Sequence, residues 1–247
     1  MLATGNNTLT NYRLSIRYCA DGFSFSVLNG LDSSVVQVDR FPVSEQAAAA
    51  DVLRQALRKP YLMDYCFQST ELVVESLFTI VPLEHFNKSD MLAFYRLCFP
   101  STANVGVADM QYQILSSLEA VMIFCLDGDI LRILQECYPD VKVCLADAQL
   151  LEQLAEQQEK RPVPEDVEQR DVYVSVSEKR LFIAAFRRGK LQYAASQDAS
   201  NDNDRAFLLL GIWRALELHP QKDALHLDGA TQDLKRTLAE YILNIED

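Results

Sequence analysis

The sequence predicts an α/β protein built from two copies of a strand-strand-strand-helix-strand unit. The first observation is the segment Asp171–Gly229, in which a hairpin, a third strand, a helix and a further strand follow one another. The second is the segment Tyr12–Glu75, which repeats that order of elements. The third is a nearly constant spacing between equivalent elements, with turns of similar length. We interpret this collinearity as an internal duplication, although residue identity between the copies is low.

The earlier copy opens with a predicted hairpin. Tyr12–Tyr18 and Phe23–Val27 alternate apolar and polar residues, which is the period of a strand with one buried face. Ala20-Asp21-Gly22 between them is a tight-turn sequence. The remaining elements are predicted, in order, at Val35–Phe41 (strand), Ser44–Arg58 (alanine-rich helix capped by Ser44) and Leu72–Val74 (strand).

The later copy has one strand with a different pattern. Asp171–Val176 alternates, whereas Leu181–Phe186 is apolar on both faces, as expected of a central strand that is covered on two sides. The polar run Gln197–Asp204 is expected to supply the N-cap of the following helix. The remaining elements are predicted at Leu191–Ala195 (strand), Arg205–Leu218 (helix), Ala224–Leu227 (strand) and Thr231–Asn244 (helix).

The stretch between the copies predicts a further hairpin and several helices. These elements are Leu77–Val81 (strand), Ser89–Cys98 (helix), Tyr112–Leu118 with Ala120–Leu126 (hairpin), Asp127–Tyr138 (helix), Val141–Leu145 (strand) and Asp147–Lys160 (helix). The charged, proline-containing run Arg161–Gln169 is the best candidate for a linker. We therefore expect a first half at residues 1–150 that includes the inserted hairpin and helix region, a connecting helix and linker at 151–170, and a second half at 171–247.

The composition is ordinary for a globular protein, with 49% hydrophobic and 23% charged residues. The net charge of −12 argues against nucleic acid and against an anionic membrane surface as partners, because both are bound mainly through Lys and Arg. Met1–Thr10 has no apolar signal core, and no stretch approaches the roughly 18 apolar residues of a membrane helix. We expect a cytoplasmic protein without direct membrane insertion.

Cysteine and histidine spacing predicts no metal site. The six cysteines lie mostly in apolar stretches without a Cys-x-x-Cys pair and are expected to be buried thiols, a disulfide or metal set being the alternative. His85 is predicted in a turn, His219 at a helix end where the dipole favours it, and His226 in a strand. Asp127-Gly128-Asp129 lacks the further ligands of an EF-hand loop and is interpreted as a helix start. Because no Gly-x-Ser-x-Gly motif is present either, no catalytic residue is assigned.

The duplicated pattern resembles the actin-like ATPase (ribonuclease H-like) fold, whose superfamily includes sugar kinases and the ATPase domain of the 70-kDa chaperones. More closely, Tyr12–Leu28, Val172–Phe186 and Leu225–Gly229 resemble a family of uncharacterised bacterial proteins of similar length with an actin-like fold. The layout is also similar to that of actin-like components of type IV pilus and type II secretion machinery. The resemblance covers nearly the whole chain.

This resemblance implies a first phosphate loop with an Asp-x-Gly motif at the first hairpin. The matching turn has Asp21 and Gly22 adjacent to one another, and no run of small hydroxyl residues follows. A phosphate loop needs glycines so that backbone N–H groups can approach phosphate oxygens, and a carboxylate to hold Mg²⁺ through water. An Asp-Gly pair makes an ordinary turn equally well.

The other two nucleotide-binding elements are also incomplete. The second hairpin has Ser177-Glu178-Lys179 where the resemblance implies another Asp and Gly, which argues against hydrolysis because two facing loops must clamp the phosphates. The Gly-rich strand-to-helix turn against adenosine is matched only by Asp228 and Gly229, where a helix N-terminus could hold an anion.

Two functions from different classes follow from these features. The first is a non-catalytic cytoplasmic scaffold or interaction module with degenerate phosphate loops and a protein partner that the sequence does not identify. The alternative is a divergent ATP-binding protein or ATPase that binds ATP and Mg²⁺ at Asp21, Gly22, Asp228 and Gly229. A third hypothesis, by analogy of layout, is a cytoplasmic partner of a membrane machine. The incomplete loops favour the first hypothesis, in which the protein is not an enzyme.

Overall fold

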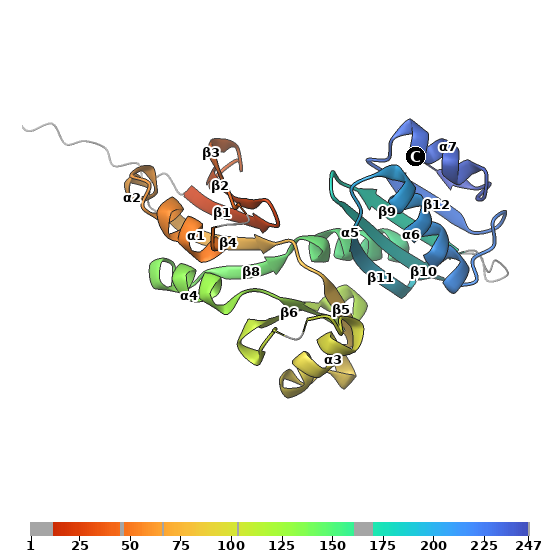
Figure 1. The fold of residues 1–247 in the computed structure, drawn as a ribbon, viewed down its shortest axis with the longest axis horizontal. Coiled ribbons are helices and arrows are strands. Elements are labelled where there is room, and N and C mark those ends of the chain that lie inside the picture. The colour runs from red at the N-terminus through yellow and green to blue at the C-terminus, as the bar shows by residue number, and fades with distance from the viewer. Residues whose placement is uncertain (1–11, 45–46, 66, 103, 161–169, 247) are drawn as a thin grey trace, which may run out of the picture. The chain divides into compact units, whose positions relative to one another are not determined.

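The computed structural model describes residues 12–44, 47–65, 67–102, 104–160 and 170–246. It contains two five-stranded sheets with equivalent strand orders and a third sheet of three strands (Figure 1). The described residues divide into two compact units. Unit 1 is drawn from Met1–Ser76, Val105–Gln111 and Cys125–Ala146, and unit 2 from Leu77–Asn104, Tyr112–Phe124 and Asp147–Asp247. The predicted linker Arg161–Gln169 lies outside the described residues.

The sheet of unit 1 has the order β3-β2-β1-β4-β8. Its strands are β1 (Tyr12–Cys19), β2 (Gly22–Asn29), β3 (Val35–Pro42), β4 (Phe67–Val74) and β8 (Lys142–Leu145). The first three form an antiparallel meander, and β4 and β8 continue the sheet in parallel. Leu14 pairs with Val27 and Ile16 with Phe25, and all four side chains are buried. The predicted hairpin and its alternation are confirmed.

Helices α1 (Ala49–Leu57), α2 (Tyr61–Asp64) and α4 (Gly128–Cys137) complete unit 1. Asp127 caps α4 as predicted, because its side chain accepts a hydrogen bond from the Asp129 N–H at 2.8 Å. The predicted start of the first helix at Ser44 is wrong. The Ser44 carbonyl accepts a hydrogen bond from the Ala47 N–H at 3.1 Å, and α1 begins at Ala49 with Ala48 at the N-cap.

The sheet of unit 2 has the order β11-β10-β9-β12-β13, which repeats the first sheet strand for strand. Its strands are β9 (Arg170–Val176), β10 (Arg180–Arg187), β11 (Lys190–Asp198), β12 (Ala224–Asp228) and β13 (Ile245–Glu246). Again the first three are antiparallel and the last two are parallel additions. This correspondence confirms the duplicated unit that the sequence predicts.

Both faces of the unit 2 sheet are covered by helices. On one face, α6 (Asp202–Ala215) and α7 (Gln232–Ala239) bury a cluster that includes Leu181, Ile183 and Trp213. On the other, α5 (Ala146–Lys160) places the amide of Gln158 2.7 Å from the Tyr173 hydroxyl. Because β10 lies between the two layers, its residues Leu181–Phe186 are all buried, as predicted.

The C-terminal helix is shorter than predicted. It ends at Ala239 rather than Asn244, and Ile245 pairs with Leu225 in the parallel strand β13. The Leu225 N–H donates to the Asn244 carbonyl at 2.9 Å, so a sheet pairing replaces the last helical turn. In the same unit α6 ends at Ala215, and His219 therefore lies in the following turn instead of at the helix end.

The inserted region forms the third sheet, in the order β5-β7-β6. It contains β5 (Phe78–Pro82), β6 (Met110–Leu115) and β7 (Ala120–Cys125), with α3 (Met91–Cys98) packed beside β5. The predicted hairpin of this region is confirmed. No helix in the described parts of the chain has the length and apolar character needed to cross a bilayer.

The prediction of buried cysteines is wrong. Cys98 and Cys137 are exposed, and Cys19, Cys125 and Cys144 are only partly buried. Cys98 and Cys137 are the last residues of α3 and α4, and these helix ends reach solvent. All five are free thiols, and Cys66 lies outside the described residues.

Candidate functional site

The four predicted nucleotide-binding residues lie at strand ends, two in each unit. Asp21 lies in the turn between β1 and β2 of unit 1, and Gly22 is the first residue of β2. Asp228 is the last residue of β12 in unit 2, and Gly229 follows it.

Gly22 is held tightly by the protein's own backbone. It is buried, with φ of +130°, and a Cβ atom at this position would lie 2.2 Å from the Phe41 carbonyl oxygen. The neighbouring Asp21 is exposed, and its carbonyl accepts a hydrogen bond from the Val43 N–H at 3.0 Å. The end of β3 therefore passes against this turn, and that packing alone requires glycine.

The residues beside this turn are aromatic. The ring of Phe23 stacks on that of Tyr18 with centroids 4.6 Å apart and planes 16° from parallel. Burial raises the pKa of the Tyr18 phenol, and the nearby Asp127 and Cys125 raise it further. The position that would carry small hydroxyl residues in a phosphate loop is thus filled by a packed phenyl ring.

Gly229 in unit 2 also has a packing explanation. Its φ is +70°, and a Cβ atom there would lie 2.4 Å from the Val176 carbonyl oxygen at the end of β9. Asp228 is exposed and lies opposite Ser175 in the register of β12 with β9. The close approach of two backbones again requires glycine, whatever the turn binds.

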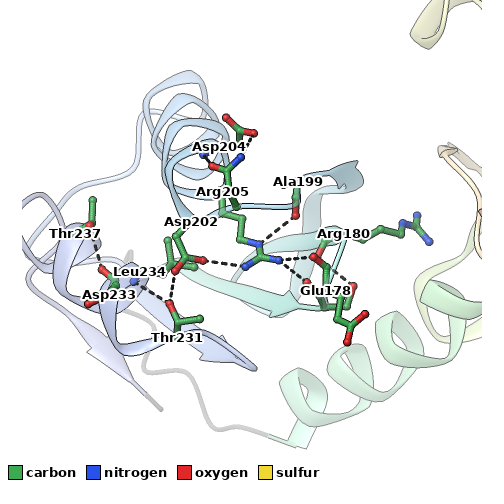
Figure 2. Close-up of polar contacts among 12 residues, drawn as sticks. Glu178, Arg180, Ala199, Asp202, Asp204, Arg205, Thr231, Asp233, Leu234 and Thr237 are labelled. Atoms are coloured by element: carbon green, nitrogen blue, oxygen red, sulfur yellow. Dashed lines mark hydrogen bonds and ion pairs between the residues drawn. The ribbon is translucent and has the colours of Figure 1, made fainter. Parts of the chain in front are cut away.

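The second hairpin turn is anchored by Arg205, a residue that the sequence marked only as a helix start. Its Nη2 donates to the carbonyls of Ser177 at 2.7 Å and Glu178 at 2.8 Å, and its Nε donates to the Ala199 carbonyl at 3.2 Å (Figure 2). Its Nη1 donates to the Asp202 carboxylate at 2.9 Å. Arg205 is buried, and the guanidinium joins the β9–β10 turn to the start of α6. We call these five residues the Arg205 anchor.

The anchor continues to the start of α7. The Thr231 hydroxyl donates to the Asp202 carboxylate and accepts from the Leu234 N–H at 3.1 Å, and so Thr231 caps the helix (Figure 2). This hydrogen bond from Thr231, together with Arg205, holds the pKa of Asp202 below its ordinary value. The ionised carboxylate of Asp202 therefore already lies at the N-terminus of α7, where the sequence analysis placed a possible bound anion.

Unit 2 contains a further polar cluster that sequence spacing could not reveal. His226 lies with Nε2 3.1 Å from Asp171 Oδ1 and Nδ1 3.3 Å from Glu246 Oε2. Its ring stacks on Tyr173 at 4.3 Å. These contacts link β9, β12 and β13. Across the described ranges, no group of three or more His, Cys, Asp or Glu side chains could hold a metal ion.

The paired sheets place the chain in the class of proteins with an actin-like ATPase fold. The particular family is also defined, because the chain belongs to the DUF3822 family, described as proteins of unknown function, whose model matches residues 4–245. A solved protein of Bacteroides thetaiotaomicron, with an actin-like ATPase fold and unknown function, has 26% identity and a TM-score of 0.77. The match covers 99% of this chain and 93% of that one. The predicted family resemblance and fold are confirmed.

Two further solved structures match the chain at lower similarity. The cytoplasmic domain of EpsL, an inner-membrane component of the type II secretion system of Vibrio cholerae, has 14% identity and a TM-score of 0.46, with 94% of each chain covered. A chain of the PilM–PilN type IV pilus biogenesis complex has 11% identity and a TM-score of 0.48, covering 95% of this chain and 90% of that one. No curated protein matches the chain.

Proposed function

We propose that the chain is a non-catalytic cytoplasmic scaffold or interaction module, which keeps the actin-like fold without its phosphate-binding chemistry. The observation that carries this proposal is the Arg205 anchor. A phosphate loop must direct backbone N–H groups at the phosphate oxygens. At the second hairpin, the carbonyl oxygens of Ser177 and Glu178 are directed at a guanidinium instead, and the Ser177 N–H donates to the Arg180 carbonyl.

The charges of the anchor also oppose phosphate. A guanidinium has five N–H donors, and Arg205 directs four hydrogen bonds to oxygen atoms of the protein itself. A phosphate at the start of α7 would in addition meet the Asp202 carboxylate, which is ionised at neutral pH and whose pKa is lowered further by the hydrogen bonds from Thr231 and Arg205. Two like charges at short range repel, and each disfavours the charged form of the other.

The first hairpin supports the same conclusion by a different route. Gly22 is required by its contact with Phe41, and Phe23 is stacked on Tyr18. The glycine therefore needs no ligand to account for it. If a nucleotide does bind, Asp21, Gly22, Asp228 and Gly229 remain the positions that we expect to contact it.

A protein partner is proposed from the surface of unit 1. Strand β3 is an edge of its sheet, and Val35, Val36 and Val38 on it are exposed. Exposed apolar edge strands are sites at which an extended segment of another chain can add to a sheet. The free thiols are consistent with the reducing cytoplasm.

A thermal-denaturation titration with ATP and Mg²⁺ tests the proposal. Ligand binding to the native state raises the melting temperature by mass action, so millimolar nucleotide reports even weak sites. We expect no shift. A Mg²⁺-dependent rise that Asp21→Ala abolishes would establish the ATP-binding alternative, provided that Asp32→Ala, which changes an exposed aspartate in the next turn of the same sheet, retains it.

A further inference from the structure

Helix α6 carries two features on its outer face that the protomer itself does not explain. Phe207 is 78% exposed. Gly211, one turn later, is also exposed, and apart from its chain neighbours and the backbone of its own helix no described atom lies within 4 Å of the place where its Cβ would be. An exposed phenylalanine forgoes hydrophobic burial, and glycine within a helix weakens it relative to alanine. A second chain that covered this face would bury the Phe207 ring and could occupy the open space at Gly211.

The two residues belong to a continuous stripe, which we call the α6 seam. It consists of Asp204, Phe207, Gly211 and Arg214, all exposed and spaced by three, four and three residues. This spacing keeps side chains on one face of a helix and is the spacing of residues that face a second helix. Leu208 and Leu210, which are partly buried, are predicted by the helical period to flank the seam on either side.

We propose that the α6 seam binds the α6 seam of a second copy of this chain, antiparallel and about a twofold axis. The seam is complementary to itself in that orientation, because Phe207 and Gly211 are equally far from the midpoint, as are Asp204 and Arg214. Phe207 of each protomer then lies over Gly211 of the other, in the space that a missing Cβ leaves. Asp204 of each protomer lies opposite Arg214 of the other, and the axis repeats both contacts.

The charges select this orientation. A parallel pairing would set Asp204 against Asp204 and Phe207 against Phe207, with no opposite charges facing each other. In the protomer, one carboxylate oxygen of Asp204 accepts from the Asn201 amide at 2.6 Å, and the second oxygen is directed to the partner's arginine in the proposed pairing. The net charge of −12 opposes non-specific association, so the two Asp–Arg pairs give the contact its specificity.

This inference adds a partner to the proposed function and does not depend on it, because a nucleotide-binding chain could carry the same surface. The ATP titration tests the proposed function, and the oligomeric state tests the pairing through the α6 seam.

Sedimentation velocity of the full chain over a concentration series tests the proposal. We expect a dimer whose Kd rises about tenfold or more in Phe207→Ala and in Gly211→Gln, which fills the space opposite the phenyl ring. Leu97→Ala is the matched control, because Leu97 is 80% exposed on α3 and should not affect the Kd. At a concentration below the Kd of the parent dimer, thermal denaturation should give Gly211→Gln a melting temperature at least equal to that of the parent, because its site is open in the protomer.

A charge exchange tests the orientation. Asp204→Lys and Arg214→Asp should each be monomeric alone, since each sets like charges together twice. Mixing them should restore a dimer, because every pair in the mixed dimer is again opposite. A parent chain that stays monomeric at all concentrations, or a dimer unaffected by Phe207→Ala, would overturn the proposal. A mixture that stays monomeric would overturn the antiparallel pairing.

Discussion

Replacing Arg205 with alanine tests whether the anchor stabilises unit 2. The substitution removes hydrogen bonds to the carbonyls of Ser177, Glu178 and Ala199 and the ion pair with Asp202. Hydrogen bonds to charged groups contribute about 1.5–3 kcal/mol each, but the loss depends on whether water replaces the missing donor.

The structure distinguishes these contacts by their access to water. Ser177 and Glu178 are exposed, so water can satisfy their carbonyls and little free energy is lost there. Ala199 is 3% exposed, and leaving its carbonyl without a donor costs about 1–3 kcal/mol. The Asp202 side chain is partly exposed, and the loss of its ion pair is discounted for solvent screening to about 0.5–1 kcal/mol. We expect Arg205→Ala to lower the free energy of unfolding of unit 2 by about 3 kcal/mol.

The chain offers a specific reporter for this measurement. Its single tryptophan, Trp213, is buried on α6, so its fluorescence follows the unfolding of unit 2 in urea. Arg236→Ala, which removes an exposed arginine of α7, is the control and should change the free energy of unfolding by less than about 0.5 kcal/mol. Arg205→Lys should give an intermediate loss, because one ammonium group cannot reach all four acceptors. A loss below about 1 kcal/mol in Arg205→Ala at an unchanged m-value would refute the role assigned to the anchor.

Two further predictions concern the substitution of two glycines and the dependence of stability on pH. Gly22→Ala should destabilise unit 1 by about 2–4 kcal/mol in calorimetry, because of its positive φ and the Phe41 carbonyl, whereas Gly211→Ala should stabilise α6 by about 0.5–1 kcal/mol. A Gly22→Ala protein as stable as the parent would contradict the packing explanation. Since the folded pKa of Asp202 is lowered, its contribution to stability is complete above the unfolded value of about 3.9 and is lost as the pH falls through the folded pKa. The urea midpoint of the parent should therefore fall more steeply below pH 4 than that of Asp202→Asn, and equal slopes would disprove this contribution.

Much of the fold could be predicted because its strands carry local signals. Residues Tyr12–Val27 alternate around an Asp-Gly turn, and the structure places a hairpin there. The two-sided apolar run Leu181–Phe186 becomes a strand with both faces covered. These patterns depend on the period of the chain and not on its distant neighbours.

The errors occur where tertiary contacts overrule a local pattern. Ile245 continues the apolar period of the last helix, but its pairing with Leu225 makes it a strand residue. Ser44 is a good helix cap by type, yet α1 begins at Ala49 and has Ala48 at its N-cap. The residues next to Ile245 and Ser44 in the sequence give no signal of either outcome.

The anchor at the second hairpin was missed for a related reason. The acceptors of Arg205 at Ser177 and Glu178 are backbone carbonyls 28 and 27 residues away, and a carbonyl is present at every position. One signal was available. Arg205 lies four and eight residues before Leu209 and Trp213, on the buried face of α6, and an arginine on a buried face requires internal acceptors.

The two copies share a feature of their turns that does not by itself indicate function. Gly22 and Gly229 both have positive φ, and each lies against a carbonyl oxygen of a neighbouring strand. This chain therefore requires glycine at both positions whether or not it binds phosphate, and the glycine alone cannot distinguish the two cases. The groups that face the turn do distinguish them, because a phosphate needs N–H donors whereas a guanidinium needs carbonyl oxygens. On this criterion Arg205, more than the missing glycine of the second hairpin, argues against phosphate binding, because it directs the carbonyl oxygens of Ser177 and Glu178 to a guanidinium.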